Sequence, residues 1–138
     1  MENSLLAQKM EAFRQNFQEN DALANYLGIK LVEVRPGYAK GILPIKEELL
    51  NGLRTTNGGA VFTLADVVFA AASNSHGIPA VSLQASISYL KPSTLGDTLT
   101  AIATEDNLTK RTGLYRIEIR NTKEELIALA QGTVFRKN

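Results

Sequence analysis

The most apolar stretch of the chain runs from Ala60 to Ala72, where almost every side chain is apolar. A helix that is apolar around its whole circumference is typical of one that is buried on every side. We therefore expect a buried central helix from about Gly59 to Ser75. Gly77 suits the left-handed position past a helix end, and Pro79 prevents the helix from continuing.

The segment after this helix predicts strands. Residues Val81 to Tyr89 alternate strictly, which is typical of a half-buried strand, and the alternation places these apolar side chains on one face: Val81, Leu83, Ala85, Ile87 and Tyr89. Further strands are expected at Thr98–Thr104, Leu114–Arg120 and Leu126–Arg136. Short polar connections between them suit antiparallel neighbours, so we expect the four strands to form a meander.

The part of the chain before the central helix predicts two strands and two further helices. Strands at Ile29–Val34 and Tyr38–Ile45 should be joined by Arg35-Pro36-Gly37, where proline presets a turn and glycine permits positive φ. A short helix is expected from Asp21 to Gly28, and one helical turn within residues 46–50.

The first residues carry a helical apolar stripe made of Leu6, Met10, Phe13 and Phe17. This spacing predicts an amphipathic helix over residues 4–17 that packs on the body of the protein. Membrane anchoring is less favoured, because the stripe is narrow and the polar face is not rich in Lys or Arg.

Together these elements predict an α+β fold in which a curled antiparallel sheet wraps around one long central helix, with an extra N-terminal helix. A chain of 138 residues is long enough for one domain with a proper core. We expect residues 1–22 to form the N-terminal helical segment and residues 23–138 the domain.

The composition limits which partners and which kinds of site are expected. The 15 basic and 14 acidic side chains are spread along the chain, so neither nucleic acid nor an anionic membrane is an expected partner. There is no cysteine and a single histidine, His76, so no metal site is expected. Because neither a signal peptide nor a membrane span is visible, we expect a cytoplasmic protein.

The central helix contains one carboxylate, Asp66, in its apolar run. A buried carboxylate costs several kcal/mol unless it is paired or protonated. Asp66 is therefore either a catalytic group or a structural acid hydrogen-bonded to a hydroxyl such as Thr63. At the start of the helix, Gly58 and Gly59 either ease the turn or offer free N–H groups that could hold an anion or a developing oxyanion.

Spacing suggests how Asp66 and the glycines could act together. At about 1.5 Å per residue, Asp66 lies roughly 10 Å along the helix from Gly59, too far for both to reach one carbonyl. Two antiparallel copies of the helix across a dimer axis would bring each Asp66 to the other copy's glycine end. This arrangement predicts two composite sites per dimer.

Several widely spaced motifs resemble the hotdog-fold acyl-CoA thioesterases of the phenylacetic acid degradation type. The resemblance covers the chain from about Leu23 to Phe135 and is carried by these residues: Asn51, Asn57-Gly58-Gly59, Phe62 to Asp66, Phe69-Ala70, Asn74-Ser75, Ala80 to Ser82, Tyr89 to Pro92, and Gly96-Asp97. It implies a hotdog fold, dimers that join their sheets edge to edge and commonly pair into tetramers, and hydrolysis of acyl- or aryl-acyl-coenzyme A. Coenzyme A enters as part of the substrate, and no separate cofactor is implied.

The resemblance also implies roles for individual residues. Asp66 would be the general base or the nucleophile, Gly58 or Gly59 would donate an N–H to the thioester oxygen, and Asn51 would position the water or the carbonyl. Ser82 would assist near the carboxylate, and Asn57 stands beside the two glycines. The candidates for substrate binding are Phe62, Phe69, Tyr89, Lys91, Pro92, Ser93, Lys110, Arg111, Thr112 and Gly113.

Asn57 departs from the family pattern, in which histidine often precedes the glycines. An amide can donate a hydrogen bond as a neutral imidazole can, but it carries no charge near neutral pH. This motivates an alternative function, a non-catalytic acyl-CoA or acyl-carrier binding protein on the same scaffold. A hotdog hydratase or dehydratase ranks last, because His76 is expected at the far end of the helix in a structural role.

Overall fold

The computed structural model describes residues 2–137. Met1, the first residue of the predicted N-terminal segment, and Asn138, the last residue of the predicted domain, lie outside the described residues. The elements, in chain order, are α1 (Glu2–Asn20), α2 (Ala22–Leu27), β1 (Lys30–Arg35), β2 (Tyr38–Pro44), η1 (Glu47–Leu49), α3 (Gly58–Asn74), β3 (Ala80–Tyr89), β4 (Thr98–Leu108), β5 (Thr112–Arg120) and β6 (Leu126–Arg136). Each predicted helix and strand is present, and α1 and β4 are longer than predicted. Gly28 and Gly37 take the positive φ expected of a helix end and a hairpin turn, at 91° and 75°.

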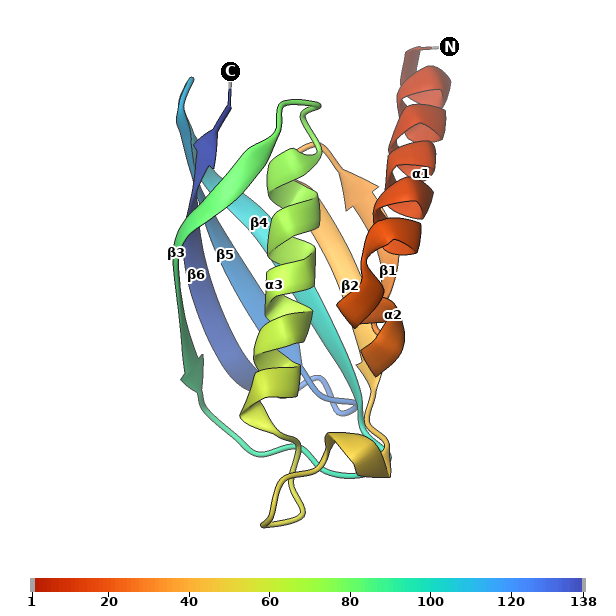
Figure 1. Cartoon of the computed structure of the whole chain (residues 1–138), viewed down its shortest axis with the longest axis vertical. Coiled ribbons are helices and arrows are strands. Elements are labelled where there is room, and N and C mark those ends of the chain that lie inside the picture. Colours follow the sequence, from red (N-terminus) through yellow and green to blue (C-terminus); the bar gives the residue numbers. More distant parts are fainter. Residues whose placement is uncertain (1, 138) are drawn as a thin grey trace.

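The six strands form one antiparallel sheet in the order β1-β2-β4-β5-β6-β3 (Figure 1). The strands β4, β5 and β6 form the expected meander. The prediction that β3 begins this meander is wrong, because β3 pairs with β6 at the far edge of the sheet. The physical reason is the connection over residues 90–97, which is too long for a tight hairpin and carries the chain across the sheet to a position beside β2.

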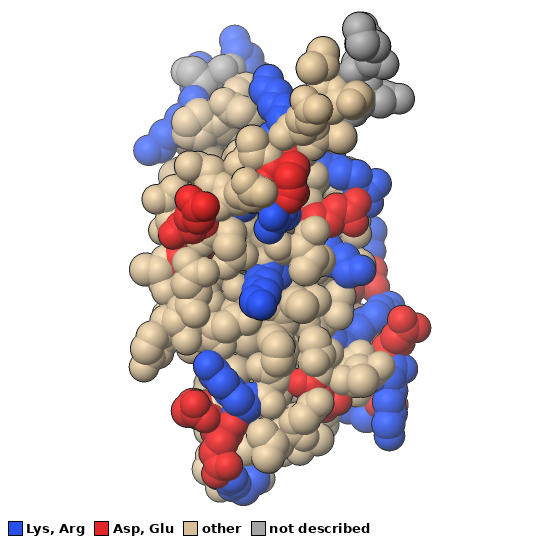
Figure 2. Space-filling model, turned by 90° about the vertical axis from the view of Figure 1, so that its right-hand side faces the viewer, with Lys and Arg blue, Asp and Glu red and all other residues tan. Residues whose placement is uncertain are grey.

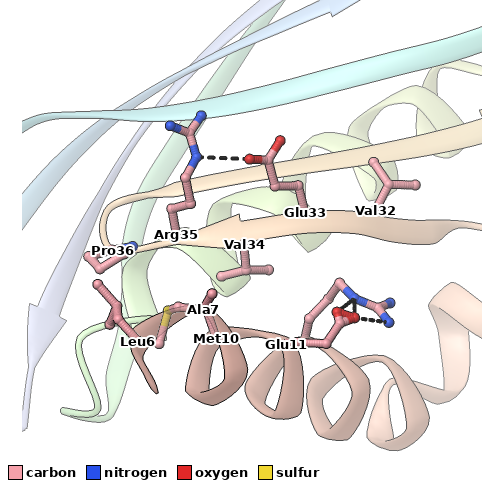
Figure 3. A pocket seen from close by; sticks show the side chains of 10 residues that line it. Leu6, Ala7, Met10, Glu11, Val32, Glu33, Val34, Arg35 and Pro36 are labelled. Atoms are coloured by element: carbon pink, nitrogen blue, oxygen red, sulfur yellow. Dashed lines mark hydrogen bonds and ion pairs between the residues drawn. The ribbon is translucent and has the colours of Figure 1, made fainter. Parts of the chain in front are cut away.

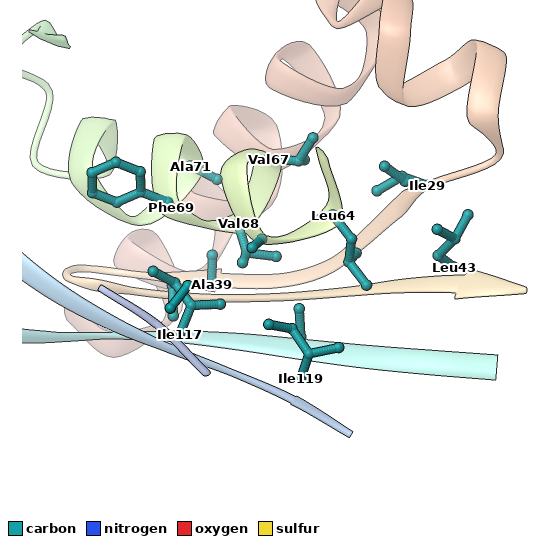
Figure 4. Close-up of a cluster of buried hydrophobic side chains, with 14 of the residues drawn as sticks. Ile29, Ala39, Leu43, Leu64, Val67, Val68, Phe69, Ala71, Ile117 and Ile119 are labelled. Atoms are coloured by element: carbon teal, nitrogen blue, oxygen red, sulfur yellow. The ribbon is translucent and has the colours of Figure 1, made fainter. Parts of the chain in front are cut away.

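The sheet curls around α3, as predicted, and most of the core lies between them (Figure 4). From α3, Leu64 and Val68 are fully buried against the sheet, and Ile117 and Ile119 face them from β5. The prediction that α3 is buried on every face is wrong. One stripe of α3 is exposed or half-buried in the single chain, and it consists of Gly59, Phe62, Thr63, Asp66, Ala70 and Asn74.

β3 also departs from its predicted pattern. A β-bulge between Ser82 and Gln84 interrupts the pairing with β6, and the strict alternation breaks there. Val81 and Leu83 are 42% and 61% exposed. β3 is thus an exposed edge strand that presents apolar side chains to its surroundings.

The other edge strand, β1, is covered by α1. Gln18 Oε1 accepts a hydrogen bond from Leu31 N at 2.7 Å, and Gln18 Nε2 donates to Ile29 O at 3.0 Å. Arg14 Nη1 donates to Leu31 O at 2.9 Å. These side chains take the positions that a neighbouring strand would use, so α1 blocks this part of the edge.

The face that carries α1 mixes acidic and basic side chains and shows no field of one sign (Figure 2). This agrees with the net charge of +1. Within residues 2–137, no helix has the length and apolar character that crossing a membrane requires.

Candidate active site

The N-terminus of α3 is built around Asn57, the residue that caps the helix. Its backbone is extended, with φ −60° and ψ 130°, and its Oδ1 accepts a hydrogen bond from Gly59 N at 2.7 Å. Gly58 N–H donates no hydrogen bond within residues 2–137. The phenol of Tyr89, at the end of β3, donates to Gly58 O at 2.8 Å. One backbone donor therefore faces outward at the positive end of the helix dipole.

A pocket of about 230 Å³ opens beside this helix end. Its lining includes the predicted site residues Asn51, Gly58, Tyr89, Lys91, Pro92 and Ser93. The structure thus brings together part of the predicted set from two segments that are far apart in the sequence, residues 51–58 and residues 89–93.

Asn51 is held by its own loop. Its Oδ1 accepts hydrogen bonds from Leu53 N at 2.9 Å and Thr55 N at 3.2 Å, and its Nδ2 donates to Thr55 Oγ1 at 3.0 Å. The side chain therefore shapes the pocket wall. An amide nitrogen has two hydrogens, so one donor of Asn51 is left for a ligand.

Asp66 lies in the middle of α3, on its exposed stripe. Desolvation by the surrounding side chains raises the pKa of its carboxyl group, and the negative charge of Asp21 adds to this effect. The carboxylate reaches solvent, yet packed apolar groups remove part of its hydration. A carboxylate whose pKa is raised is a stronger base than an ordinary one.

A second, small pocket lies between Asp66 and the sheet. Its lining includes Phe62 and Phe69 from α3, Ala85 from β3, and Gln131 from β6. The two phenylalanines were predicted as substrate-binding residues. Gln131 was not, because nothing in its local sequence distinguishes it from other polar strand residues.

A single chain does not bring Asp66 and the helix N-terminus together. They lie eight residues apart on one straight helix, which corresponds to about 12 Å. They also line different pockets. This agrees with the spacing argument made from the sequence.

Other predicted substrate-binding residues are engaged within the fold. Lys91 is paired with Glu125, whose pKa is lowered by hydrogen bonds from Lys91 and from Asn121. Ser93 is buried, and its Oγ donates to Thr56 Oγ1 at 2.7 Å. Ser93 therefore braces the pocket wall instead of offering its hydroxyl to a ligand.

The turn between β4 and β5 carries Lys110 and Arg111, which are exposed. It lies at the opposite end of the molecule from the N-terminus of α3 (Figure 1). In this region Thr112 bonds to Thr109 within the turn, and Gly113 is buried. A Cβ at Gly113 would come within 2.9 Å of Tyr115, so this glycine has a packing role.

Ser82 and His76 lie outside both pockets. Ser82 is exposed on β3 beside the bulge, and it does not line the pocket next to Asp66. His76 follows the C-terminal end of α3, where its Nε2 is 2.7 Å from Glu105 Oε1. Tyr115 Oη donates to the same carboxylate oxygen at 2.6 Å, so His76 belongs to a cluster that ties the end of α3 to the sheet.

Another groove lies between α1 and β1 (Figure 3). It has a volume of about 410 Å³, and its apolar lining includes Leu6, Met10 and Val34. Two ion pairs, Glu11 with Arg14 and Glu33 with Arg35, flank it. It contains none of the predicted site residues, and its charged groups already have partners.

Comparisons with known proteins agree on one family. The family model described as the thioesterase superfamily matches residues 53–128. A protein of Archaeoglobus fulgidus is 42% identical over 132 residues, which cover 96% of this chain and 86% of the relative. The acyl-coenzyme A thioesterase PaaI of Escherichia coli is 42% identical over 114 residues, which cover 83% of this chain and 81% of the relative.

Solved structures extend the similarity to three dimensions. The structure of E. coli PaaI, a protein from the phenylacetic acid degradation operon, matches with a TM-score of 0.92 and 38% identity, and the match covers 96% of both chains. A Streptococcus mutans protein solved with bound acetyl-CoA matches with a TM-score of 0.76 and 30% identity. That match covers 80% of this chain and 89% of the other.

Proposed function

The chain belongs to the thioesterase superfamily, and we propose that it is an acyl-CoA thioesterase that hydrolyses acyl- or aryl-acyl-coenzyme A to the free acid and coenzyme A. The observation that carries the proposal is the constellation on α3. A desolvated carboxylate, Asp66, lies on the exposed stripe of an otherwise buried helix whose N-terminus has a free amide, that of Gly58.

The substrate class rests on two relatives. One is named an acyl-coenzyme A thioesterase, and another was solved with acetyl-CoA bound. In this chain, the small pocket beside Asp66 is lined by Phe62 and Phe69 and is apolar enough for the start of an acyl or aryl group. The side chains of Lys110 and Arg111 are exposed and form no ion pair in the part of the chain that the structure describes, which suits them to the phosphates of coenzyme A.

The proposed reaction uses two groups, the Asp66 carboxylate and the backbone amides at the N-terminus of α3. Water attacks the thioester carbonyl carbon while the Asp66 carboxylate accepts its proton, or Asp66 itself attacks and the resulting anhydride is then hydrolysed. In both routes the backbone N–H of Gly58, which Asn57 leaves free, stabilises negative charge on the thioester oxygen. In the first route the C–S bond breaks when the tetrahedral intermediate collapses to the free acid. In the second route it breaks as the anhydride forms, before water hydrolyses the anhydride. In both routes the coenzyme A thiolate leaves and is protonated.

A site of this kind requires two chains. The exposed edge strand β3 can pair with the β3 of a second copy, which joins the two sheets and sets the two α3 helices antiparallel. Each Asp66 would then approach the partner's Gly58, and each turn with Lys110 would move toward the partner's helix N-terminus. We expect a homodimer of this form, with dimers pairing into a homotetramer.

The first test is the substitution Asp66→Asn, which keeps the shape of the side chain but removes the base. It should abolish thiol release from acyl-CoA substrates while the fold and the oligomer remain, as measured by circular dichroism and gel filtration. The matched control is Asp106→Asn, the same change at an exposed carboxylate on β4, which should keep full activity. An active Asp66→Asn enzyme would rule out the assignment of the base.

A second candidate function is favoured by one observation, the Asn57 at the position where the family often has histidine. On that reading the protein binds acyl-CoA or an acyl carrier without hydrolysing it. Titration of coenzyme A combined with a thiol-release assay over short, medium, long and aromatic acyl-CoA separates the two functions. Binding without turnover across the whole panel would establish the second.

A further inference from the structure

The peptide group between Gly58 and Gly59 is hydrogen-bonded at both ends. Tyr89 Oη donates to its carbonyl oxygen at 2.8 Å, and Asn57 Oδ1 accepts from its N–H at 2.7 Å. The first bond comes from the end of β3, and the second comes from the cap of α3 itself. Two elements that are far apart in the sequence therefore hold one peptide.

This arrangement fixes the orientation of the peptide. A peptide unit is planar and trans, so its C=O and N–H point in opposite directions within one plane. Hydrogen bonds at both ends prevent that plane from rotating. Both glycines lie in the first turn of α3. Because neither residue has a Cβ to restrict φ and ψ, these two hydrogen bonds add to the restraint that the helix turn provides.

The sheet supplies the rigid support for this hold. Tyr89 is the last residue of β3 and is opposite Ala128 of β6, and the next residue, Leu90, donates from its N–H to Ile127 O at 2.8 Å. The ring of Tyr89 lies directly over Gly58, where an added Cβ would come within 3.2 Å of the phenol carbon. A glycine at position 58 thus permits the ring to reach the peptide.

The same hydrogen bonds decide which donors remain for a ligand. Gly59 N–H is used by Asn57, whereas Gly58 N–H donates to nothing within residues 2–137. Because Asn57 accepts with Oδ1, its Nδ2 points away from Gly59, and it makes no hydrogen bond among those residues. Two free donors, Gly58 N–H and Asn57 Nδ2, therefore lie next to each other at the helix end.

We propose that Tyr89 and Asn57 are positioning residues that clamp the Gly58–Gly59 peptide and so hold Gly58 in place. The N–H of Gly58 belongs to the preceding Asn57–Gly58 peptide, and with Gly58 held it is aimed at the thioester oxygen. The proposal rests on the proposed hydrolase function. It assigns Tyr89, expected from the sequence to line an acyl pocket, to the alignment of the oxyanion donor. It also gives Asn57 a role in orientation that needs no charge.

The main test is Tyr89→Phe, which removes only the hydroxyl. Loss of alignment should lower kcat by roughly tenfold to a hundredfold, because donors that stabilise the transition state are sensitive to small displacements. KM should stay within about twofold, because the ground-state contacts remain. Tyr26→Phe is the matched control, since Tyr26 is 81% exposed on α2, and it should leave both constants unchanged.

A second pair of variants tests the other end of the clamp. Asn57→Ala removes the acceptor for Gly59 N–H and should lower kcat, whereas Asn57→Ser keeps a capping oxygen and should restore part of it. Because both residues hold one peptide, the loss in the double variant Tyr89→Phe with Asn57→Ala should be smaller than the product of the single losses. Strictly multiplicative losses would contradict a shared clamp.

Amide hydrogen exchange, measured by NMR, tests the clamp independently of enzymatic activity. Gly59 N–H should exchange slowly in the unmodified protein and faster in Tyr89→Phe and Asn57→Ala, while Gly58 N–H exchanges fast in all three. If the unmodified protein hydrolyses acyl-CoA but Tyr89→Phe has an unchanged kcat or leaves the exchange of Gly59 unchanged, the positioning role is wrong and the hydrolase function stands. If the unmodified protein hydrolyses no member of the panel, the hydrolase function and the catalytic role of the clamp both fail, whatever the exchange shows.

Discussion

Asp66, the proposed base, would serve catalysis at the expense of stability. Its neighbours on α3, Ala65 and Val67, are buried, and the carboxylate projects from the exposed stripe between them. Desolvation raises the pKa of its carboxyl group, so the folded protein holds this proton more tightly than the unfolded chain does. Ionised Asp66 therefore opposes folding, a cost that catalytic groups commonly carry.

The effect gives a prediction for stability against pH. Between the ordinary carboxyl pKa of 3.8 and its raised value in the folded protein, the native state binds more protons than the unfolded state. The stability contributed by this group is thus present at low pH and is lost as pH rises through that window. Asp66→Asn should remove the loss, so its advantage in free energy of unfolding over the unmodified protein should grow with pH.

Denaturant unfolding of Asp66→Asn and of the unmodified protein at a series of pH values measures this difference. An advantage of Asp66→Asn that is constant or shrinks as pH rises would show that Asp66 is not desolvated. Activity should change in the opposite sense to stability, because the ionised carboxylate is the active form and its fraction increases as pH rises through the raised pKa.

Other residues show why type and position in the sequence are insufficient to assign a role. Ser93 and Gly113 lie in polar loop sequences and were predicted to bind substrate, yet both are buried and support the fold. Lys91 lines the pocket as expected, but Glu125, 34 residues away in the sequence, shares its charge. Burial and pairing depend on neighbours that no local pattern identifies.

At the scale of elements, the two edge strands of the sheet differ in how far they are covered. α1 covers β1 with the side chains of Gln18 and Arg14, whereas β3 is left open. An exposed edge strand offers unpaired N–H and C=O groups to another chain, so the coverage of β1 agrees with the proposal that association uses β3. The amphipathic pattern predicted that α1 packs on the body, but it did not predict which strand α1 covers.

The edge contacts lead to a prediction for Gln18→Ala. The substitution leaves Leu31 N–H and Ile29 C=O, which are partly buried, without their partner, and it should lower the free energy of unfolding by about 1–2 kcal/mol. Gln15→Ala is the matched control, because Gln15 is exposed on the same helix and should change stability by less than about 0.5 kcal/mol. Equal stabilities of the two variants in denaturant unfolding would show that Gln18 does not support the edge.

At the scale of the whole molecule, the separation of Asp66 from the N-terminus of α3 leads to a test of the shared site. Gly58→Pro removes the free N–H, and proline is tolerated at the first position of a helix. The extended backbone of Asn57 also suits a residue that precedes proline. Gly58→Ala meets the same tyrosine ring but keeps the N–H, so it is the matched control.

Asp66→Asn and Gly58→Pro should each be inactive alone, yet mixed dimers of the two should be active. In a mixed dimer one site carries both changes and the other carries neither, so random assembly should restore roughly a quarter of the unmodified activity. Thiol release from a refolded mixture measures the recovery, and differently tagged chains show that mixed dimers form. Mixed dimers without activity would place both groups in the same chain's site.

The sequence by itself determined the elements, the central role of α3, the presence of one carboxylate in it, and the family resemblance that the comparisons confirm. These features follow from local periodicity and from short motifs, which report what each residue prefers irrespective of its distant neighbours. For the same reason, the bounds of the hairpin, of α2 and α3 and of most strands agree closely with the structure, whereas α1 and β4 are longer than predicted.

Only the tertiary structure decided the strand order, the bulge in β3, the exposed stripe of α3 and the clamp from Tyr89 to Gly58. Each depends on pairing between segments that are distant in the sequence, and the pairing energy is set by which edges and faces meet. A periodic pattern predicts that a side chain is buried, but it does not predict which segment packs against it. For this reason Asp66 was expected inside the core, whereas the fold places it on the exposed stripe of α3.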